Sequence, residues 1–145
     1  MAKQKLKLAF LCNERIVPEW LYSIISRVSE SESAEVALLI FPMNRLDHDI
    51  LLHIPNSSGS TLYHKFIEND KKKYELMPNA FATKNLSEIQ AQETLELDFT
   101  NHDNQIDISP ESTQKLDEYQ IDVFVNLTGH VIKDSLFNIP TYGIW

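Results

Sequence analysis

The fold is decided by "KLKLAFLCNERIVPEWLYSIISRVSESESAEVALLIF", the stretch from Lys5 to Phe41. It opens with a short, nearly continuous apolar run at 6–11, which is typical of a central strand covered on both faces. Pro18 suits the first turn of a helix, and apolar residues then recur at helical spacing. These are Trp20, Leu21, Ile24, Ile25 and Val28. A second apolar strand at 35–41 stops at Pro42. Strand, helix and strand with short connections predict two parallel neighbours.

The second half of the chain repeats the order of helix and strand. Ser109 followed by Pro110 is a clear helix start, because serine caps the first turn and proline fits the first helical position. The predicted helix runs through Leu116 to Tyr119, and "IDVFVNL" at 121–127 supplies another apolar strand. The sequence therefore predicts an α/β, Rossmann-like three-layer fold with a mostly parallel sheet.

The middle of the chain carries weaker signals. Residues 44–60 read as an irregular loop, and Ser60 begins a predicted helix that ends before Pro78. Residues 79–93 look irregular and "NHDNQIDI" at 101–108 reads as a polar loop. Between these two segments Leu95, Leu97 and Phe99 alternate with polar residues, which predicts an edge or near-edge strand.

Composition sets the class of protein. The 145 residues suit one domain spanning 1–145, and the formal net charge of -8 disfavours nucleic acid as a partner. No run approaches the roughly 18 to 20 apolar residues of a membrane helix, and the first residues pass straight into a strand pattern, so we expect a cytoplasmic protein without a membrane partner. Cys12 lies in an apolar run and is expected to be a small buried hydrophobe.

Ligands of open α/β sheets collect beyond the carboxyl ends of the strands, and the first such end is "CNERIVP" at 12–18. Dinucleotide and P-loop proteins carry glycines here so that backbone N–H groups can approach phosphates. This turn has no glycine, which disfavours both classes. Asn13, Glu14 and Arg15 remain possible ligand contacts through their side chains, and a plain polar turn is the alternative.

The second strand end contains Gly129, whose backbone freedom permits a sharp turn or the close approach of a flat ligand. Val131 and Ile132 would add an apolar wall. His130 is either a pocket residue or a structural histidine. No metal site is expected, because His64 has no second ligand at helical spacing and His102 reads as a solvated loop residue.

The segment "DVFVNLTGHVIKDSLFNIPTYGIW", at 122–145, resembles the folate-dependent formyltransferases, and the opening strand, helix and strand agree with the beginning of that family. The resemblance implies a 10-formyltetrahydrofolate donor, a small-molecule ligand whose pterin pocket is lined by the backbone matched by Gly129, His130, Val131 and Ile132.

The family's catalytic Asn, His and Asp have no counterpart in the sequence, and the position of the Asn would follow Trp145. The resemblance thus implies the N-terminal, folate-side portion of a formyltransferase-like domain, incomplete relative to the family and inactive alone. Its unfinished sheet edge would pair with a second copy in a homodimer or with a missing C-terminal segment. The alternative is a non-catalytic α/β ligand-binding or protein-interaction module of receiver-like outline. Glu14 and Lys133 match only part of the set of acidic and lysine residues that a receiver domain would carry.

Overall fold

A computed structural model of the chain describes residues 4–44, 82–102 and 105–145, and a few separate positions between 62 and 72. The described positions between Leu62 and Lys72 are helical, in keeping with the helix expected there. The loop expected at 44–60 lies, beyond Asn44, outside the described residues, as does His64.

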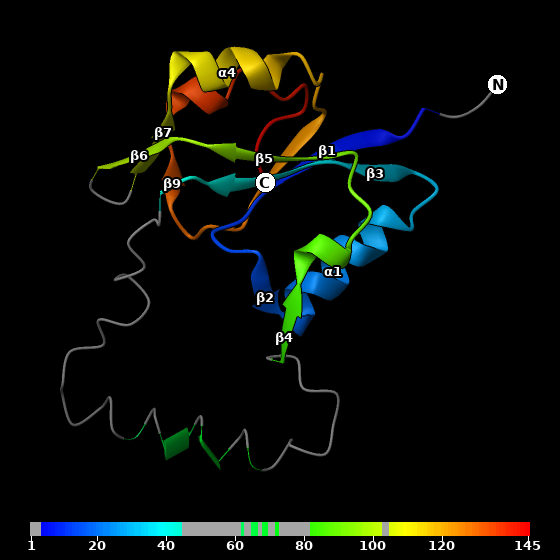
Figure 1. The fold of residues 1–145 in the computed structure, drawn as a ribbon, viewed down its shortest axis with the longest axis vertical. Helices are drawn as coiled ribbons and strands as arrows, with labels where there is room; N and C mark the ends of the chain where they lie inside the picture. The colour runs from blue at the N-terminus through cyan, green and yellow to red at the C-terminus, as the bar shows by residue number, and fades with distance from the viewer. Residues whose placement is uncertain are drawn as a thin grey trace.

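Four parallel strands form the central sheet (Figure 1). They are β1 (Leu6–Leu11), β3 (Ala34–Pro42), β5 (Glu93–Leu97) and β8 (Val123–Asn126). Their order is β5-β3-β1-β8, and each neighbouring pair runs parallel. The predicted α/β, Rossmann-like fold is confirmed, and β5 is the edge strand that the alternating pattern indicated.

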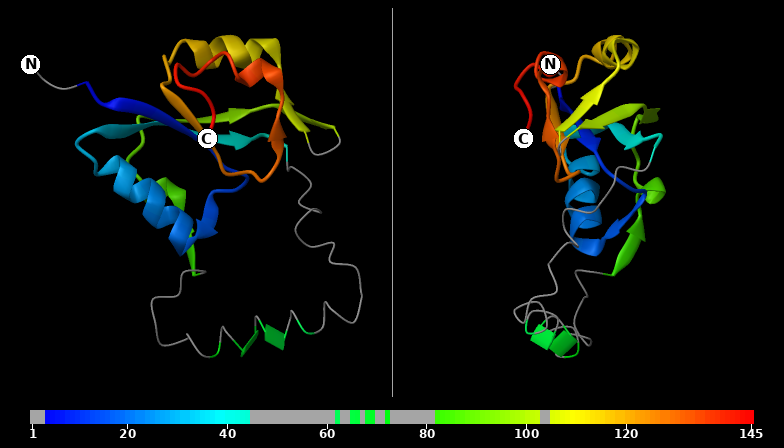
Figure 2. Two further views of the ribbon diagram at one scale, coloured as in Figure 1. Left: turned by 180° about the vertical axis from the view of Figure 1, so that it is seen from behind. Right: turned by 90° about the vertical axis from the view of Figure 1, so that its left-hand side faces the viewer.

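Among the described residues, one helix covers each face of this sheet. Helix α1 (Glu19–Ser29) and helix α4 (Pro110–Asp117) lie on opposite sides of the strands (Figures 1 and 2). Pro18 is the N-cap of α1, one residue before the predicted position, while the Ser109 hydroxyl accepts a hydrogen bond from the Ser112 backbone N–H, as expected of an N-cap. The arrangement gives three layers, helix, sheet and helix.

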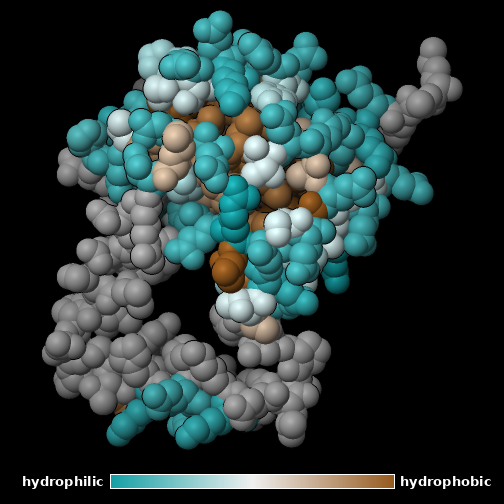
Figure 3. Space-filling model, viewed as in Figure 1, coloured by the Kyte–Doolittle hydropathy of each residue, from teal (hydrophilic) through white to brown (hydrophobic). Residues whose placement is uncertain are grey.

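Side chains alternate along the strands between two apolar cores, which is why the strands read as continuous apolar runs. The core under α1 includes Phe10, Cys12, Leu21, Ile25, Val36, Leu39 and Phe41. The core under α4 includes Ala9, Leu11, Leu38, Ile40, Leu116, Ile121 and Phe124. Figure 3 shows the apolar side chains between the layers in the middle of the molecule, with hydrophilic residues above and below.

The prediction that 79–93 is irregular is wrong at 83–88, holds at 89–92, and falls at 79–81 outside the described residues. Strand β4 (Thr83–Asn85) pairs antiparallel with β2 (Ile16–Pro18), and a short 3₁₀ helix, η1 (Leu86–Glu88), follows. The Leu86 N–H donates to the Arg15 carbonyl oxygen over 2.8 Å, and the Leu86 side chain is fully buried. Burial of one leucine anchors a polar segment whose own pattern gives no strand signal.

The prediction of a polar loop at 101–108 is also wrong for the described residues, 101–102 and 105–108, which form strands. Strand β6 (Phe99–His102) pairs antiparallel with β7 (Gln105–Ile108), and β7 pairs parallel with β9 (Val131–Ile132). Phe99 therefore belongs to β6 and not to the strand that holds Leu95 and Leu97. Ile106 and Ile108 alternate with polar residues and are buried, so this small sheet adds to the core under α4.

The last residues run beside β8. After the 3₁₀ helix η2 (Asp134–Leu136), the Trp145 N–H donates to the Phe124 carbonyl oxygen over 2.8 Å, and the Phe124 N–H donates to the Gly143 carbonyl oxygen over 3.1 Å. Ile144 thus forms a parallel bridge with Phe124. Within the described ranges, no helix is long and apolar enough to cross a membrane.

Candidate functional site

The turn that follows β8 is built around Gly129. Its φ of 76° lies in the left-handed region that glycine adopts without strain, so the sharp turn predicted here is present. A Cβ placed on Gly129 would meet no atom within 4 Å. The backbone of the turn is therefore open on that side, and a flat ligand can come close to it.

Asn126 holds the turn together with its side chain. Its Nδ2 donates to the His130 carbonyl oxygen over 2.8 Å, and its Oδ1 accepts from the Thr128 hydroxyl over 2.7 Å and from the Thr128 N–H over 3.2 Å. Asparagine at the start of a turn often bonds the backbone two residues later, which is the signal that sequence reasoning overlooked at Asn126.

The His130 ring is buried in the same turn, with only 4% of the residue exposed. Its Nδ1 lies 3.1 Å from the Thr128 carbonyl oxygen, which can only accept, so Nδ1 carries the hydrogen. The opposite nitrogen, Nε2, is buried and has no partner among the described residues. The ring supports the turn from inside, and the His130 N–H donates to the Thr128 hydroxyl oxygen over 3.2 Å, so this N–H is used within the turn.

The two predicted strand ends meet at Thr128. The Asn13 Nδ2 donates to the Thr128 carbonyl oxygen over 2.8 Å, which joins the turn after β1 to the turn after β8. Arg15 points elsewhere, since its guanidinium lies 2.7 Å from the Glu96 carboxylate and 4.7 Å from the centre of the Phe41 ring. Glu14 is exposed. Asn13, one of the three contacts expected after the first strand, is thus tied to the Gly129 turn.

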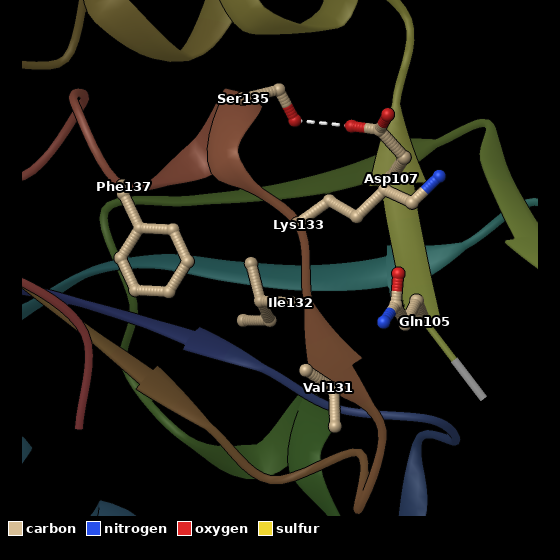
Figure 4. A pocket seen from close by; sticks show the side chains of 7 residues that line it. All are labelled: Gln105, Asp107, Val131, Ile132, Lys133, Ser135 and Phe137. Carbon is tan, nitrogen blue, oxygen red and sulfur yellow. Dashed lines mark hydrogen bonds between the residues drawn. The ribbon is translucent and has the colours of Figure 1, made fainter.

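A cavity of about 630 Å³ opens beside the turn (Figure 4). Its lining joins the segment after the turn to strand β7, and consists of Gln105, Asp107, Val131, Ile132, Lys133, Ser135 and Phe137. Val131 and Phe137 are exposed apolar side chains at this opening. Val131 and Ile132, two of the four residues expected in a pterin pocket, therefore contribute to its wall.

Strand register explains which side chains reach this cavity. Gln105 lies opposite Val131 and Ile106 opposite Ile132, in parallel strands whose side chains alternate between two faces. Ile106 and Ile132 point into the core under α4, and Gln105 and Val131 point outward. The hairpin that sequence reasoning missed thus supplies two of the seven lining residues, Gln105 and Asp107, and the alternation in "QIDI" was the signal for it.

The polar groups of the cavity differ in their partners. The Ser135 hydroxyl donates a short hydrogen bond to the Asp107 Oδ1, drawn in Figure 4, and the Ile108 N–H donates to the same oxygen over 3.0 Å. The Gln105 amide and the Lys133 ammonium make no hydrogen bond or ion pair with any described residue. The cavity therefore offers several unused donors beside an apolar wall.

The groups around this cavity are suited to holding a ligand. No group of three His, Cys, Asp or Glu side chains that could hold a metal occurs in the part of the chain that the structure describes. Burial raises the pKa of the Cys12 thiol to about 12, so this thiol stays protonated and is no nucleophile at neutral pH. The arrangement combines a flat apolar wall, backbone accessible at a glycine turn, and polar side chains at one end.

Comparison with known proteins gives no match to this chain among family models, curated proteins or solved structures. Its class therefore follows from the fold alone, an α/β protein with a Rossmann-like parallel sheet.

Proposed function

We propose that this chain is the folate-side portion of a 10-formyltetrahydrofolate-dependent, formyltransferase-like protein of the cytoplasm. The observation that carries the proposal is the position of the Gly129 turn. It lies at the carboxyl end of β8, where open α/β sheets bind ligands, and it leads directly into the wall of the cavity.

The residues at this place suit a pterin. A flat bicyclic ring would pack against the exposed side chains of Val131 and Phe137, and its amide-like edge would approach the backbone left open at Gly129. A volume of about 630 Å³ falls within the range of small-molecule pockets. Bound there, the donor would supply the activated formyl group.

The proposal covers donor binding and not turnover by this chain alone. Formyl transfer needs polarising and proton-transferring groups preorganised around the formyl carbon, and the family's Asn, His and Asp set has no counterpart in these residues. The hydrogen bonds to β8 come from Gly143 and Trp145, so the backbone of Ile144 between them faces the outer side of the sheet. A further segment or a second copy that supplies the trio would pair along this edge.

The test is calorimetric titration of the 145-residue chain with 5-formyltetrahydrofolate, a stable relative of the donor. We expect saturable binding that Gly129→Ala abolishes, because the added Cβ occupies the approach and a φ of 76° strains alanine.

Gly143→Ala is the matched control. Gly143 also has a positive φ, 96°, so its substitution causes similar backbone strain away from the cavity and should leave binding intact. Absence of binding to the unmodified chain would overturn the proposal and favour the alternative, a non-catalytic α/β binding or interaction module. Robust formyl transfer by the chain alone would contradict the proposal that this chain binds the donor without catalysing the transfer by itself.

A further inference from the structure

The polar end of the cavity is suited to a negatively charged group. Register places Lys133 one step beyond the Ile106–Ile132 pair, and its backbone N–H donates to the Ile106 carbonyl oxygen over 3.0 Å. Because side chains two residues apart share a face, Lys133 and Gln105 project on the same outward side as Val131. Figure 4 shows these side chains around one opening, with Phe137 at the far end from Gln105.

The remaining polar groups of the lining are already engaged with each other. Asp107 accepts from Ser135 and from the Ile108 N–H, and Figure 4 shows its carboxylate turned toward Ser135. Lys133 and Gln105 have no partner among the described residues and together supply five N–H hydrogens. A ligand that complements them accepts hydrogen bonds and carries negative charge, which strengthens each bond.

We infer that Lys133 and Gln105 form a carboxylate-binding subsite, which takes the acidic end of a ligand whose flat body lies against Val131 and Phe137. The inference rests on the proposed function and extends it, since it assigns the glutamate carboxylates of the folate to this end of the cavity. Specificity for folates over free pterins would then come from Gln105 on β7 and from Lys133, the first residue after β9.

Three probes separate the parts of the ligand. Tetrahydrofolate carries both the pterin and the glutamate, tetrahydropteroate lacks the glutamate, and p-aminobenzoylglutamate lacks the pterin. We expect tetrahydrofolate to bind the unmodified chain about tenfold more tightly than tetrahydropteroate, the difference typical of one hydrogen-bonded charged group. Added salt should reduce this preference, because the site is open to solvent.

Variants of the chain locate the preference. Lys133→Gln should remove the tenfold difference, and Lys133→Arg should keep most of it, since arginine also binds carboxylates. Lys115→Gln, which removes the same charge from an exposed position on α4, is the matched control and should change nothing. Asp107→Asn should raise tetrahydrofolate affinity a few-fold, because it removes a competing negative charge and leaves an oxygen for Ser135.

Equal binding of tetrahydrofolate and tetrahydropteroate would overturn the subsite and leave the proposed function intact. If neither pterin binds, the proposed function fails and p-aminobenzoylglutamate decides the subsite by itself. Binding of this probe that is lost in Lys133→Gln supports the subsite, and no binding, or binding that Lys133→Gln leaves unchanged, overturns it.

Discussion

The side-chain amide of Asn13 donates a 2.8 Å hydrogen bond to the backbone carbonyl of Thr128, 115 residues further along the chain. The same carbonyl lies 3.1 Å from the buried His130 ring. One backbone oxygen thus holds together the ends of the two neighbouring strands β1 and β8. The shape of the Gly129 turn, and with it one wall of the cavity, depends on a residue from the first strand end.

We expect Asn13→Ala to lower the free energy of unfolding by about 1–2 kcal/mol, because it removes one partly buried hydrogen bond and opens a small gap. Urea unfolding followed by circular dichroism measures the change. Asn44→Ala removes an exposed side-chain hydrogen bond to Asp98 and serves as the control, with an expected loss under about 0.5 kcal/mol. Equal losses in the two variants would show that the Thr128 contact adds no more than a surface contact.

Helix α1 offers a matched pair of neighbouring isoleucines. Ile25 is fully buried under the sheet, and Ile24 is 48% exposed on the outer side of the helix. Ile25→Ala should cost about 2–5 kcal/mol, because it leaves a cavity in a close-packed core, and Ile24→Ala under about 1 kcal/mol. Denaturant midpoints of the two variants compare them directly. Similar midpoints would mean that α1 does not pack in the orientation described.

The sequence was a good guide where an element carries its own signal. Apolar runs located β1, β3 and β8, and the Ser109–Pro110 step located the start of α4, since both depend on neighbours along the chain. Strands β2 and β4 have three residues each and are stabilised by their pairing and by the burial of Leu86. A pattern this short has no period to detect.

Some features of the candidate site could likewise be predicted from the sequence, and others could not. Gly129 could be predicted because a glycine directly after an apolar strand signals a turn. The direction of the Arg15 side chain could not, because it depends on Glu96, 81 residues away, and the wall contributed by Gln105 and Asp107 required knowledge of the parallel pairing of β7 with β9. Contacts between distant segments decide these features, and local patterns do not contain them.

The cap of helix α4 is open to a direct test. The Ser109 hydroxyl accepts from the Ser112 N–H over 3.2 Å, so Ser109→Ala should cost about 1 kcal/mol of unfolding free energy. Ser109→Asp keeps an acceptor and adds a charge that the helix N-terminus favours, so it should restore most of the loss. Thermal or urea unfolding of the unmodified chain and the two variants gives the order of their stabilities. An aspartate variant as unstable as the alanine variant would argue against capping as the cause.

In the alkaline range, ionisation of the Cys12 thiol makes the free energy of unfolding depend on pH. Burial raises the pKa of its thiol from 9.0 to about 12, so the unfolded chain releases this proton at a pH where the folded chain still holds it. The free energy of unfolding should therefore be unaffected by this group below about pH 9 and fall by up to about 1.4 kcal/mol per pH unit above it, until the folded thiol itself ionises.

Urea unfolding between about pH 8 and about pH 10.5 measures the slope, and Cys12→Ala is the reference. The Tyr119 hydroxyl, whose hydrogen bond to Glu93 raises its pKa to about 12, contributes to both proteins and cancels in the comparison. The unmodified chain should lose stability more steeply than Cys12→Ala, and parallel slopes would show that the thiol is not buried in the folded protein.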